Sequence, residues 1–158
     1  FIYLDVNDTL SGDDAVIKVY LSDNATGIVN FCINDYNYTS NVVNGIASLV
    51  FSGLDVGLND VEANYPGDNH YKANSSSSSF IVYKLKSPIS VNVDDTLFGD
   101  DVIISVTLGK NTSGVVSFNI NGSEYLCNVS DGFASVVLSG LNLGIYGLDV
   151  YYSGDIRH

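Results

Sequence analysis

The chain contains an internal repeat with a period of 87 residues. When residues 2–71 are placed on residues 89–158, the two segments align without a gap, and 31 of the 70 aligned positions are identical. A duplicated unit of this length is typical of modules that are strung in tandem. An enzyme rarely needs a second copy of itself in the same chain, whereas a spacer or a multivalent surface does.

The repeat predicts how the 158 residues are organised into domains. We expect repeat 1 at residues 1–86 and repeat 2 at residues 87–158. Lys86-Ser87-Pro88 reads as the linker, because proline stiffens the chain and cannot donate a ladder hydrogen bond. Modules of about 80 residues bury only about 60% of their unfolded surface, so each should be modestly stable on its own.

Composition and charge exclude several kinds of partner. The hydrophobic fraction is 46% and the charged fraction 15%, which indicates a folded chain. The net charge of −12 repels phosphate backbones and anionic lipid, so we expect no nucleic-acid partner. We see no membrane span in this segment and no signal peptide. The chain begins at Phe1, which suggests a mature fragment or an excised piece.

Asparagine is used in a way that indicates N-glycosylation. With 17 Asn and 26 Ser plus Thr, chance predicts about three Asn-x-Ser/Thr sites, but the chain has seven. The excess predicts an extracellular, glycosylated surface protein; the alternative is a polar composition that forms such sites by accident. The seven acceptors are Asn7, Asn24, Asn37, Asn74, Asn111, Asn121 and Asn128.

Hydrophobic alternation dominates the chain, and helical periodicity is absent. Ser75–Ser79 reads as a low-complexity loop, and Asn34-Asp35 and Asn121-Gly122 as two-residue hairpin turns. Seven short strands per repeat, with turns every eight to twelve residues, indicate an antiparallel sandwich. In repeat 1 we expect strands at Ile2–Val6, Val16–Leu21, Gly27–Ile33, Tyr38–Val43, Ile46–Phe51, Leu58–Tyr65 and Phe80–Leu85. The predicted fold is all-β: two tandem immunoglobulin-like sandwiches, the second without its last strand.

The two cysteines are not equivalent in the repeat, because Cys32 aligns with Asn119 and Cys127 with Ser40. Neither repeat contains a pair, so the two-cysteine bridge of antibody domains is excluded. Strand alternation turns Cys127 inward as a buried thiol and Cys32 outward. An exposed Cys32 is either a free thiol or a bridge between chains.

Several motifs present in both copies are similar to one family of surface repeats. In the second copy they are Asp95-Thr96-Leu97-x-Gly99-Asp100-Asp101, Gly114-x-Val116-x-Phe118-x-Ile120-Asn121-Gly122-x-x-Tyr125, Gly132-x-Ala134, Gly140-Leu141-x-x-Gly144-x-Tyr146 and Tyr152-Ser153-Gly154-Asp155. The set resembles the bacterial-type immunoglobulin-like repeats of adhesin-like cell-surface proteins in methanogenic archaea. In the Tyr-x-Gly-Asp ending, glycine can supply a positive φ and aspartate can bond the turn backbone.

The resemblance implies a function for the whole chain. It implies an extracellular, non-catalytic structural or adhesive segment at an archaeal cell surface or in a filament, without a cofactor. The expected partners are neighbouring repeats, other copies of the chain and other cell-surface molecules. A carbohydrate-binding, lectin-like module is the alternative, because exposed tyrosines can stack on sugar rings. The candidates are Tyr36, Tyr38, Tyr65, Tyr71, Tyr146, Tyr151 and Tyr152.

Metal and catalytic chemistry have weaker support. Asp13, Asp14, Asp100 and Asp101 are weak calcium candidates, but their spacing does not match a calcium loop and aspartate is common in turns. The serine run has no nucleophile elbow and no ordered His–Asp partner, so we expect no enzyme. Lys18 is a weak candidate for an isopeptide crosslink, since serine replaces it in the second copy.

The second copy ends before the strand that closes the first. The residues equivalent to 72–87 are not present after His158. We therefore expect an open sheet edge and an apolar groove in repeat 2, a template for strand addition. The missing strand is either a continuation that was cut away or a strand donated by a neighbouring chain.

Overall fold

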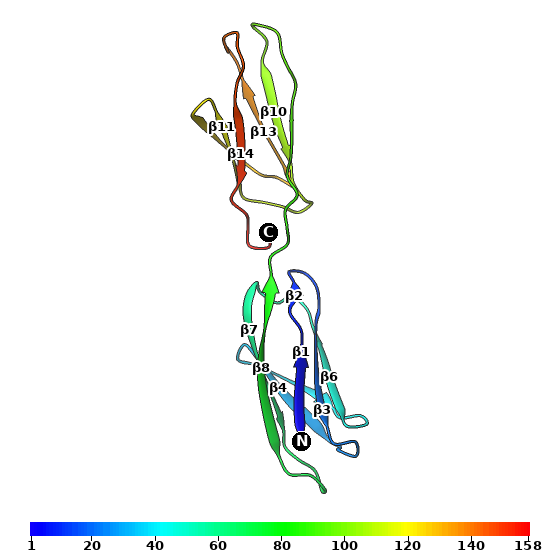
Figure 1. Cartoon of the computed structure of the whole chain (residues 1–158). Coiled ribbons are helices and arrows are strands. Elements are labelled where there is room, and N and C mark those ends of the chain that lie inside the picture. The colour runs from blue at the N-terminus through cyan, green and yellow to red at the C-terminus, as the bar shows by residue number, and fades with distance from the viewer. The chain divides into compact units, whose positions relative to one another are not determined.

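The computed structural model describes residues 1–158 and contains strands and turns but no helix. The chain divides into two compact units: unit 1 comprises Phe1–Lys84 and unit 2 comprises Leu85–His158. Both are built from strands that pair antiparallel with one exception in unit 1, which confirms the predicted all-β class (Figure 1). No helix capable of crossing a membrane is present.

Unit 1 is a sandwich of two sheets. Its strands are β1 (Ile2–Val6), β2 (Thr9–Leu10), β3 (Ala15–Leu21), β4 (Ile28–Ile33), β5 (Tyr36–Asn41), β6 (Ile46–Phe51), β7 (Gly57–Tyr65) and β8 (Asn74–Tyr83). One sheet has the order β1-β3-β6 and the other β2-β8-β7-β4-β5. All neighbours are antiparallel except β2 and β8, which run parallel. This division of strands is that of an immunoglobulin-like sandwich.

The core of unit 1 follows from alternation along its strands. On β3 the buried residues alternate with exposed or half-buried ones, and β7 has the same pattern. Phe31, Tyr65 and Phe80 are the largest side chains that the two sheets enclose between them. Successive side chains on a strand point to opposite faces, so one face of each sheet meets the core and the other meets solvent.

The tight hairpins are of the type that the sequence predicts. Asn34 and Asp35 have φ of 47° and 69°, and Asn44 and Gly45 have 50° and 74°. Two successive positive φ values define a type I′ turn, whose twist matches that of the flanking strands. At Gly45 a Cβ would lie 2.7 Å from the carbonyl oxygen of Ser22, so only glycine fits there.

The prediction of a loop at Ser75–Ser79 is wrong. These serines belong to β8, which pairs with β7 from Tyr65↔Asn74 to Gly57↔Val82. Ser76 and Ser78 point toward the sandwich and are half-buried, whereas the other three are exposed. Backbone hydrogen bonds to β7 hold these serines in a strand, because such bonds join main-chain groups and need no particular side chain.

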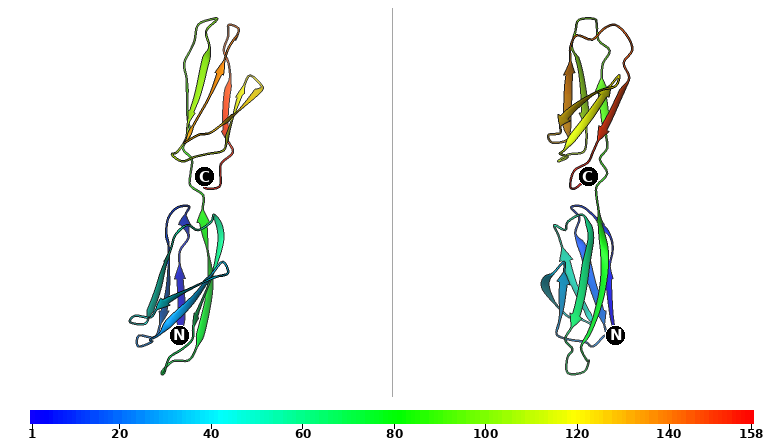
Figure 2. Two further views of the ribbon diagram at one scale, coloured as in Figure 1. Left: turned by 180° about the vertical axis from the view of Figure 1, so that it is seen from behind. Right: turned by 90° about the vertical axis from the view of Figure 1, so that its left-hand side faces the viewer.

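Unit 2 is the same sandwich with fewer strands (Figure 2). Its strands are β9 (Ser90–Val93), β10 (Val102–Thr107), β11 (Val115–Ile120), β12 (Ser123–Asn128), β13 (Phe133–Leu138) and β14 (Leu148–Tyr152). The sheets are β9-β10-β13 and β12-β11-β14. Each strand occupies the position of its repeat-equivalent in unit 1, and no strand takes the place of β8.

Candidate functional site

A hydrogen-bonded clamp lies at the end of β7. The hydroxyl of Tyr65 donates to the carbonyl oxygen of Thr26 at 2.9 Å. One carboxylate oxygen of Asp68 accepts from the amide and hydroxyl of Thr26 at 2.9 and 3.0 Å. The other accepts from the amides of His70 and Tyr71, both at 2.7 Å. The clamp joins the loop before β4 to the loop after β7.

Unit 2 contains the same clamp at repeat-equivalent positions. Tyr152 donates to the carbonyl oxygen of Ser113 at 2.7 Å, and Asp155 accepts from the Ser113 amide at 3.0 Å. The second oxygen of Asp155 accepts from the amides of Arg157 and His158 at 2.9 and 2.7 Å. The expectation that this aspartate bonds the turn backbone is confirmed.

The clamp requires its glycine and an ionised aspartate. Gly67 and Gly154 have φ of 90° and 87°, and a Cβ on Gly67 would lie 2.7 Å from the Tyr71 carbonyl oxygen. The His70 amide, followed by those of Thr26 and Tyr71, holds the pKa of Asp68 below its usual range, against the opposing effect of desolvation.

Burial also affects the pKa values of Asp155, Tyr65 and Tyr152. Desolvation alone would raise the pKa of Asp155, but the hydrogen bonds from Ser113, Arg157 and His158 outweigh it and lower that pKa. Burial, with the nearby carboxylate adding to it, raises the pKa of Tyr65 and of Tyr152. The clamp therefore stabilises the fold when the carboxylates of Asp68 and Asp155 are ionised.

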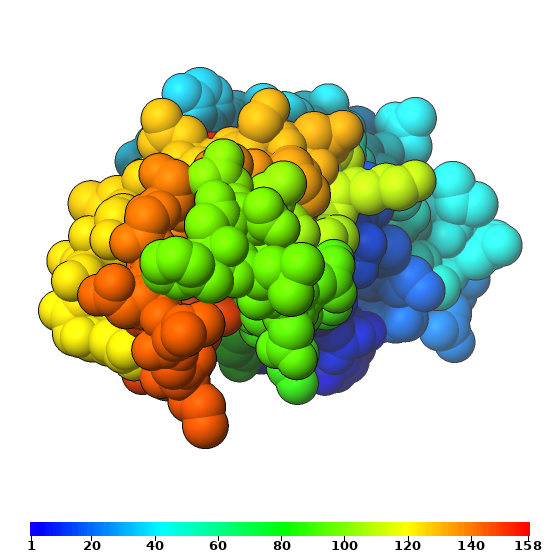
Figure 3. Space-filling model, turned by 90° about the horizontal axis from the view of Figure 1, so that it is seen from above, coloured from blue at the N-terminus to red at the C-terminus, as the bar shows by residue number.

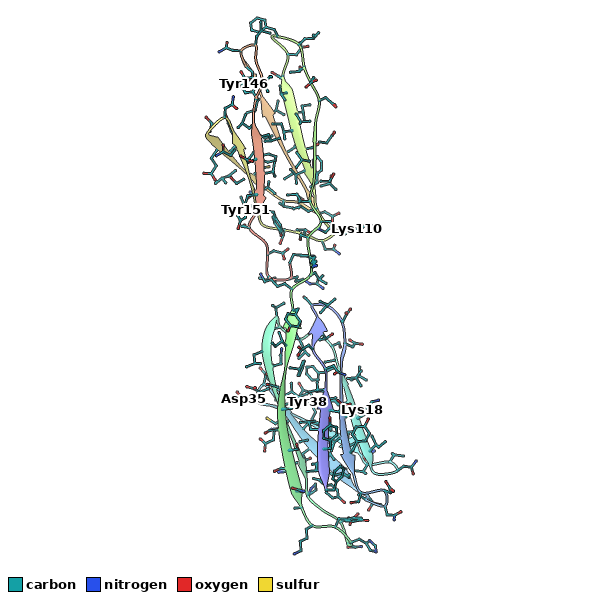
Figure 4. The ribbon with its side chains drawn as sticks, in the orientation of Figure 1. Lys18, Asp35, Tyr38, Lys110, Tyr146 and Tyr151 are labelled. Carbon is teal, nitrogen blue, oxygen red and sulfur yellow. The ribbon has the colours of Figure 1, made fainter.

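A tyrosine corner occurs in unit 2 and has a substitute in unit 1. The Tyr146 hydroxyl donates to the carbonyl oxygen of Asn142 at 2.8 Å (Figure 4). At the equivalent position Asn59, which is buried, donates to the carbonyl oxygen of Asp55 at 3.2 Å. Because 55 and 142 are repeat-equivalent, the same carbonyl is satisfied in both units by different side chains.

The parallel pair of β2 and β8 brings the two ends of unit 1 together. Thr9 lies opposite Val82 and Leu10 opposite Tyr83. Asp8 supports the pair: its carboxylate accepts from the backbone amide of Ile81 at 2.7 Å. Sequence analysis missed this role of Asp8, because its partner is 73 residues away.

All seven candidate glycosylation sites are exposed. Asn24 and Asn111 lie in the equivalent loops between β3 and β4 and between β10 and β11. Asn37 lies in β5 and Asn128 in β12, the outermost strands of their sheets. Asn121 differs, because its side-chain oxygen accepts from the Gly147 amide at 2.8 Å. Asn7 and Asn74 are also exposed, in a loop and at the start of β8.

The acidic candidates do not converge on a metal site. Asp13, Asp14, Asp100 and Asp101 are exposed in the loops before β3 and β10. Nowhere in the chain do three carboxylate, histidine or cysteine side chains come together in an arrangement that could hold a metal ion.

The tyrosines do not form one sugar-stacking platform. Tyr65 is buried, Tyr38 is half-buried with its ring edge-on to Phe51, and Tyr71 and Tyr152 are half-buried. Tyr36 and Tyr151 are well exposed, but they lie in different units. Figure 4 marks Tyr38, Tyr146 and Tyr151 on separate strands or loops.

Lys18 and the cysteines show no crosslink. Lys18 is exposed on the outer face of β3, opposite Asp5 of β1 and Ser48 of β6 (Figure 4). Cys127 packs against the core of unit 2, and its thiol donates to the Ser135 carbonyl oxygen at 3.1 Å. Cys32 is half-buried and, like Cys127, free.

Unit 2 has an apolar cleft of about 480 Å³ at one end. Its walls are the segment 93–104, which includes Leu97, and the segment 138–148, which includes Leu143 and Ile145. Figure 3 looks onto this end, where the green segment around residue 97 and the orange segment around residue 143 lie side by side. Of the residues of β14, only Leu148 lines this cleft.

Comparison with known proteins finds similar folds only. No family model matches the chain, and no curated protein matches it. The fibronectin(III)-like modules of CbhA from Clostridium thermocellum align with 99% of this chain and 87% of theirs, at 14% identity and a TM-score of 0.43.

Two longer proteins also align. A 1.5-MDa bacterial ice-binding adhesin, solved in a study of host cell surface retention, aligns over 88% of this chain and 54% of its own, at 19% identity and a TM-score of 0.42. Dimeric latent PorU from Porphyromonas gingivalis aligns over 98% of this chain and 19% of its own, at 14% identity and a TM-score of 0.36. The chain thus spans about half of the adhesin chain and about a fifth of PorU.

Proposed function

We propose that the chain is a structural and adhesive repeat segment of a glycosylated protein at the surface of an archaeal cell or in a surface filament, and that it catalyses no reaction. One observation supports this most: the two copies share their turns, core and clamp, whereas most residues on their outer faces differ. Lys18, Tyr20 and Tyr36 are replaced by Ser105, Thr107 and Ser123. A role common to both copies must therefore reside in the scaffold.

The exposed acceptor asparagines support the extracellular part of the proposal. Seven sites, all at the surface, allow a dense cover of glycan. On β5 and β12 glycans would cover outermost strands, whose unpaired backbone groups otherwise invite association with other chains. Many weak contacts from repeated modules would then give adhesion through avidity.

The β2–β8 pair supports the structural part. β2 lies near the beginning of unit 1 and β8 at its end, and they run parallel. Tension on the two ends therefore pulls the strands along their length in opposite directions. Several hydrogen bonds must break together, including the one from Ser11 to the Tyr83 carbonyl oxygen at 2.8 Å. Such an arrangement resists extension better than a pair that opens bond by bond.

Labelling of intact cells tests the proposed location. An antibody raised against the chain should label cells that produce the protein without permeabilisation. Labelling that appears only after permeabilisation would contradict the surface location. An antibody against a cytoplasmic protein of the same cells is the control for membrane integrity.

A glycan array separates the adhesive scaffold from the lectin-like alternative. The purified chain should give no specific glycan signal, since its exposed tyrosines are dispersed. A specific signal that Tyr36→Ala or Tyr151→Ala abolishes would favour the lectin. Lys18→Ala, on another exposed surface, is the matched control.

A further inference from the structure

An aromatic pair lies on the outer face of the sheet β1-β3-β6 in unit 1. Tyr3 of β1 and Tyr20 of β3 lie opposite each other in the register. Their ring centroids are 6.1 Å apart and their planes are inclined at 34°. Tyr3 is 55% exposed and Tyr20 is half-buried beside it. The apolar C–H face of a sugar ring can pack against such a pair, as another aromatic ring would.

A row of polar side chains crosses the same face next to the tyrosines. Asp5 of β1, Lys18 of β3 and Ser48 of β6 lie opposite one another (Figure 4). Lys18 and Ser48 are exposed, and Asp5 is half-buried. A sugar ring carries hydroxyl groups around its edge, and these both donate and accept hydrogen bonds. The carboxylate, ammonium and hydroxyl groups of this row supply acceptors and donors for such an edge.

An acceptor asparagine continues the outward side of β1. The even-numbered residues of β1 pack toward the core, whereas Tyr3 and Asp5 face outward. Asn7 directly follows β1, is exposed and continues the outward series. From Asn7 back to Tyr3 the strand rises about 14 Å, at about 3.4 Å per residue. A short chain of linked sugar rings on Asn7 can span this distance.

Unit 2 lacks the acceptor, the aromatic pair and the charged pair together. By contrast, Ser48 and Val50 on the same face have identical residues in unit 2, and isoleucine replaces Val16. The acceptor therefore occurs in the unit that has the side chains for holding a glycan and is absent from the unit that does not. The replacements are Asp94 for Asn7, Ser90 for Tyr3, Thr107 for Tyr20, Asn92 for Asp5 and Ser105 for Lys18.

We propose that an N-linked oligosaccharide on Asn7 lies along the outer face of β1 and β3. One of its sugar rings stacks on Tyr3 and Tyr20, and its hydroxyl groups bond Asp5 and Lys18. A single aromatic pair offers little surface to a free glycan, but the covalent tether supplies an effective concentration in the millimolar range. The bound glycan covers apolar surface of this face, which stabilises unit 1. This contact rests on the glycosylation stated in the proposed function and specifies what one of the seven sites does.

Tyrosine nitration locates the glycan. Protein purified from the cells that naturally produce it is treated with tetranitromethane, and the rate at each tyrosine is followed by peptide mapping. Tyr3 should react at least about fivefold more slowly in protein glycosylated at Asn7 than in Asn7→Gln. Tyr36 is the internal control, because it is 70% exposed on the other sheet and should react equally in both proteins. Equal rates at Tyr3 would overturn the proposal.

A double-mutant cycle separates stacking from other effects of the glycan. The Tm of unit 1 should fall by about 4 °C or more in Asn7→Gln. In a chain with Tyr3→Ser and Tyr20→Thr, the residues that unit 2 has at these positions, the same change should shift the Tm by less than about 2 °C. Asn24→Gln is the matched control, because it removes another acceptor of unit 1 and should have the same effect with or without the tyrosines. Equal effects of Asn7→Gln in both backgrounds would overturn the stacking.

Peptide mapping of the same protein distinguishes failure of this contact from failure of the proposed function. Glycan at other acceptors but not at Asn7 would overturn the contact alone. Seven bare asparagines would contradict the proposed glycosylation, and the contact with it. Protection of Tyr3 that persists in Asn7→Gln and increases with protein concentration would place a second copy of the chain on this face, which would also overturn the proposal.

Discussion

Truncation of Phe80 tests whether β8 completes the core of unit 1. Phe80→Ala removes a large side chain that is 2% exposed and packs in the main cluster of unit 1. Buried Phe→Ala changes cost about 3–5 kcal/mol. A unit of 84 residues has a stability of about 4–13 kcal/mol, so the change removes a large share of it. At about 4 °C or more per kcal/mol, the Tm of unit 1 should fall by at least about 12 °C.

The assay must report on each unit separately. Hydrogen exchange of peptides from residues 1–84 should accelerate strongly in Phe80→Ala, whereas peptides from residues 85–158 should be unchanged. Ser79→Ala is the matched control, because Ser79 is the adjacent residue and points to solvent; it should change the Tm by less than about 2 °C. A Phe80→Ala protein that melts within about 4 °C of the unmodified chain would refute the assignment of β8 to the core.

Three further predictions follow from the turns, the clamp and the surface. Gly45→Ala should destabilise unit 1 by about 2 kcal/mol or more in urea unfolding, because the added Cβ would meet the Ser22 carbonyl oxygen. Gly53→Ala is the control: Gly53 has nearly the same φ but open space around it, so this change should cost only about 1–2 kcal/mol. Equal costs would contradict the steric argument. The lowered pKa of Asp68 means that its contribution to stability is full above the unfolded pKa of about 3.9 and is lost as the pH falls below it. Acid unfolding of unit 1 should therefore depend less on pH below about 4 in Asp68→Asn, and an unchanged pH profile would contradict this. Peptide mapping of protein from producing cells should find glycan on Asn24 more often than on Asn121, whose side chain bonds the backbone; the reverse order would count against the accessibility argument.

The hairpins could be predicted from sequence because their chemistry is local. Asn34-Asp35 and Asn121-Gly122 are residues that tolerate positive φ, and each forms the expected turn between strands that are adjacent in the chain. The alternation of apolar residues likewise identified the core face of β3 and β7. Both signals are contained within fewer than ten residues.

The features that sequence analysis missed depend on distant partners. Ser75–Ser79 has no apolar pattern, and its strand exists because β7 offers a ladder edge. Asp8 has no distinguishing pattern in the sequence, yet its carboxylate accepts the backbone amide of Ile81 on β8. Asn59 had no predicted role, and it replaces the tyrosine of unit 2 at the same carbonyl. None of these contacts leaves a signature within a short window.

Single-molecule extension is the most direct test of the proposed structural role. The chain is held by its two ends and stretched until each unit unfolds. Unit 1, with 84 residues, should release about 29 nm of contour length and unit 2, with 74 residues, about 26 nm, less the folded length of each. Because unit 1 has the parallel β2–β8 pair and unit 2 has no strand in that position, the longer release should occur at the higher force. If unit 1 extends gradually or yields before unit 2, the account of the chain as a tension-resistant repeat is contradicted.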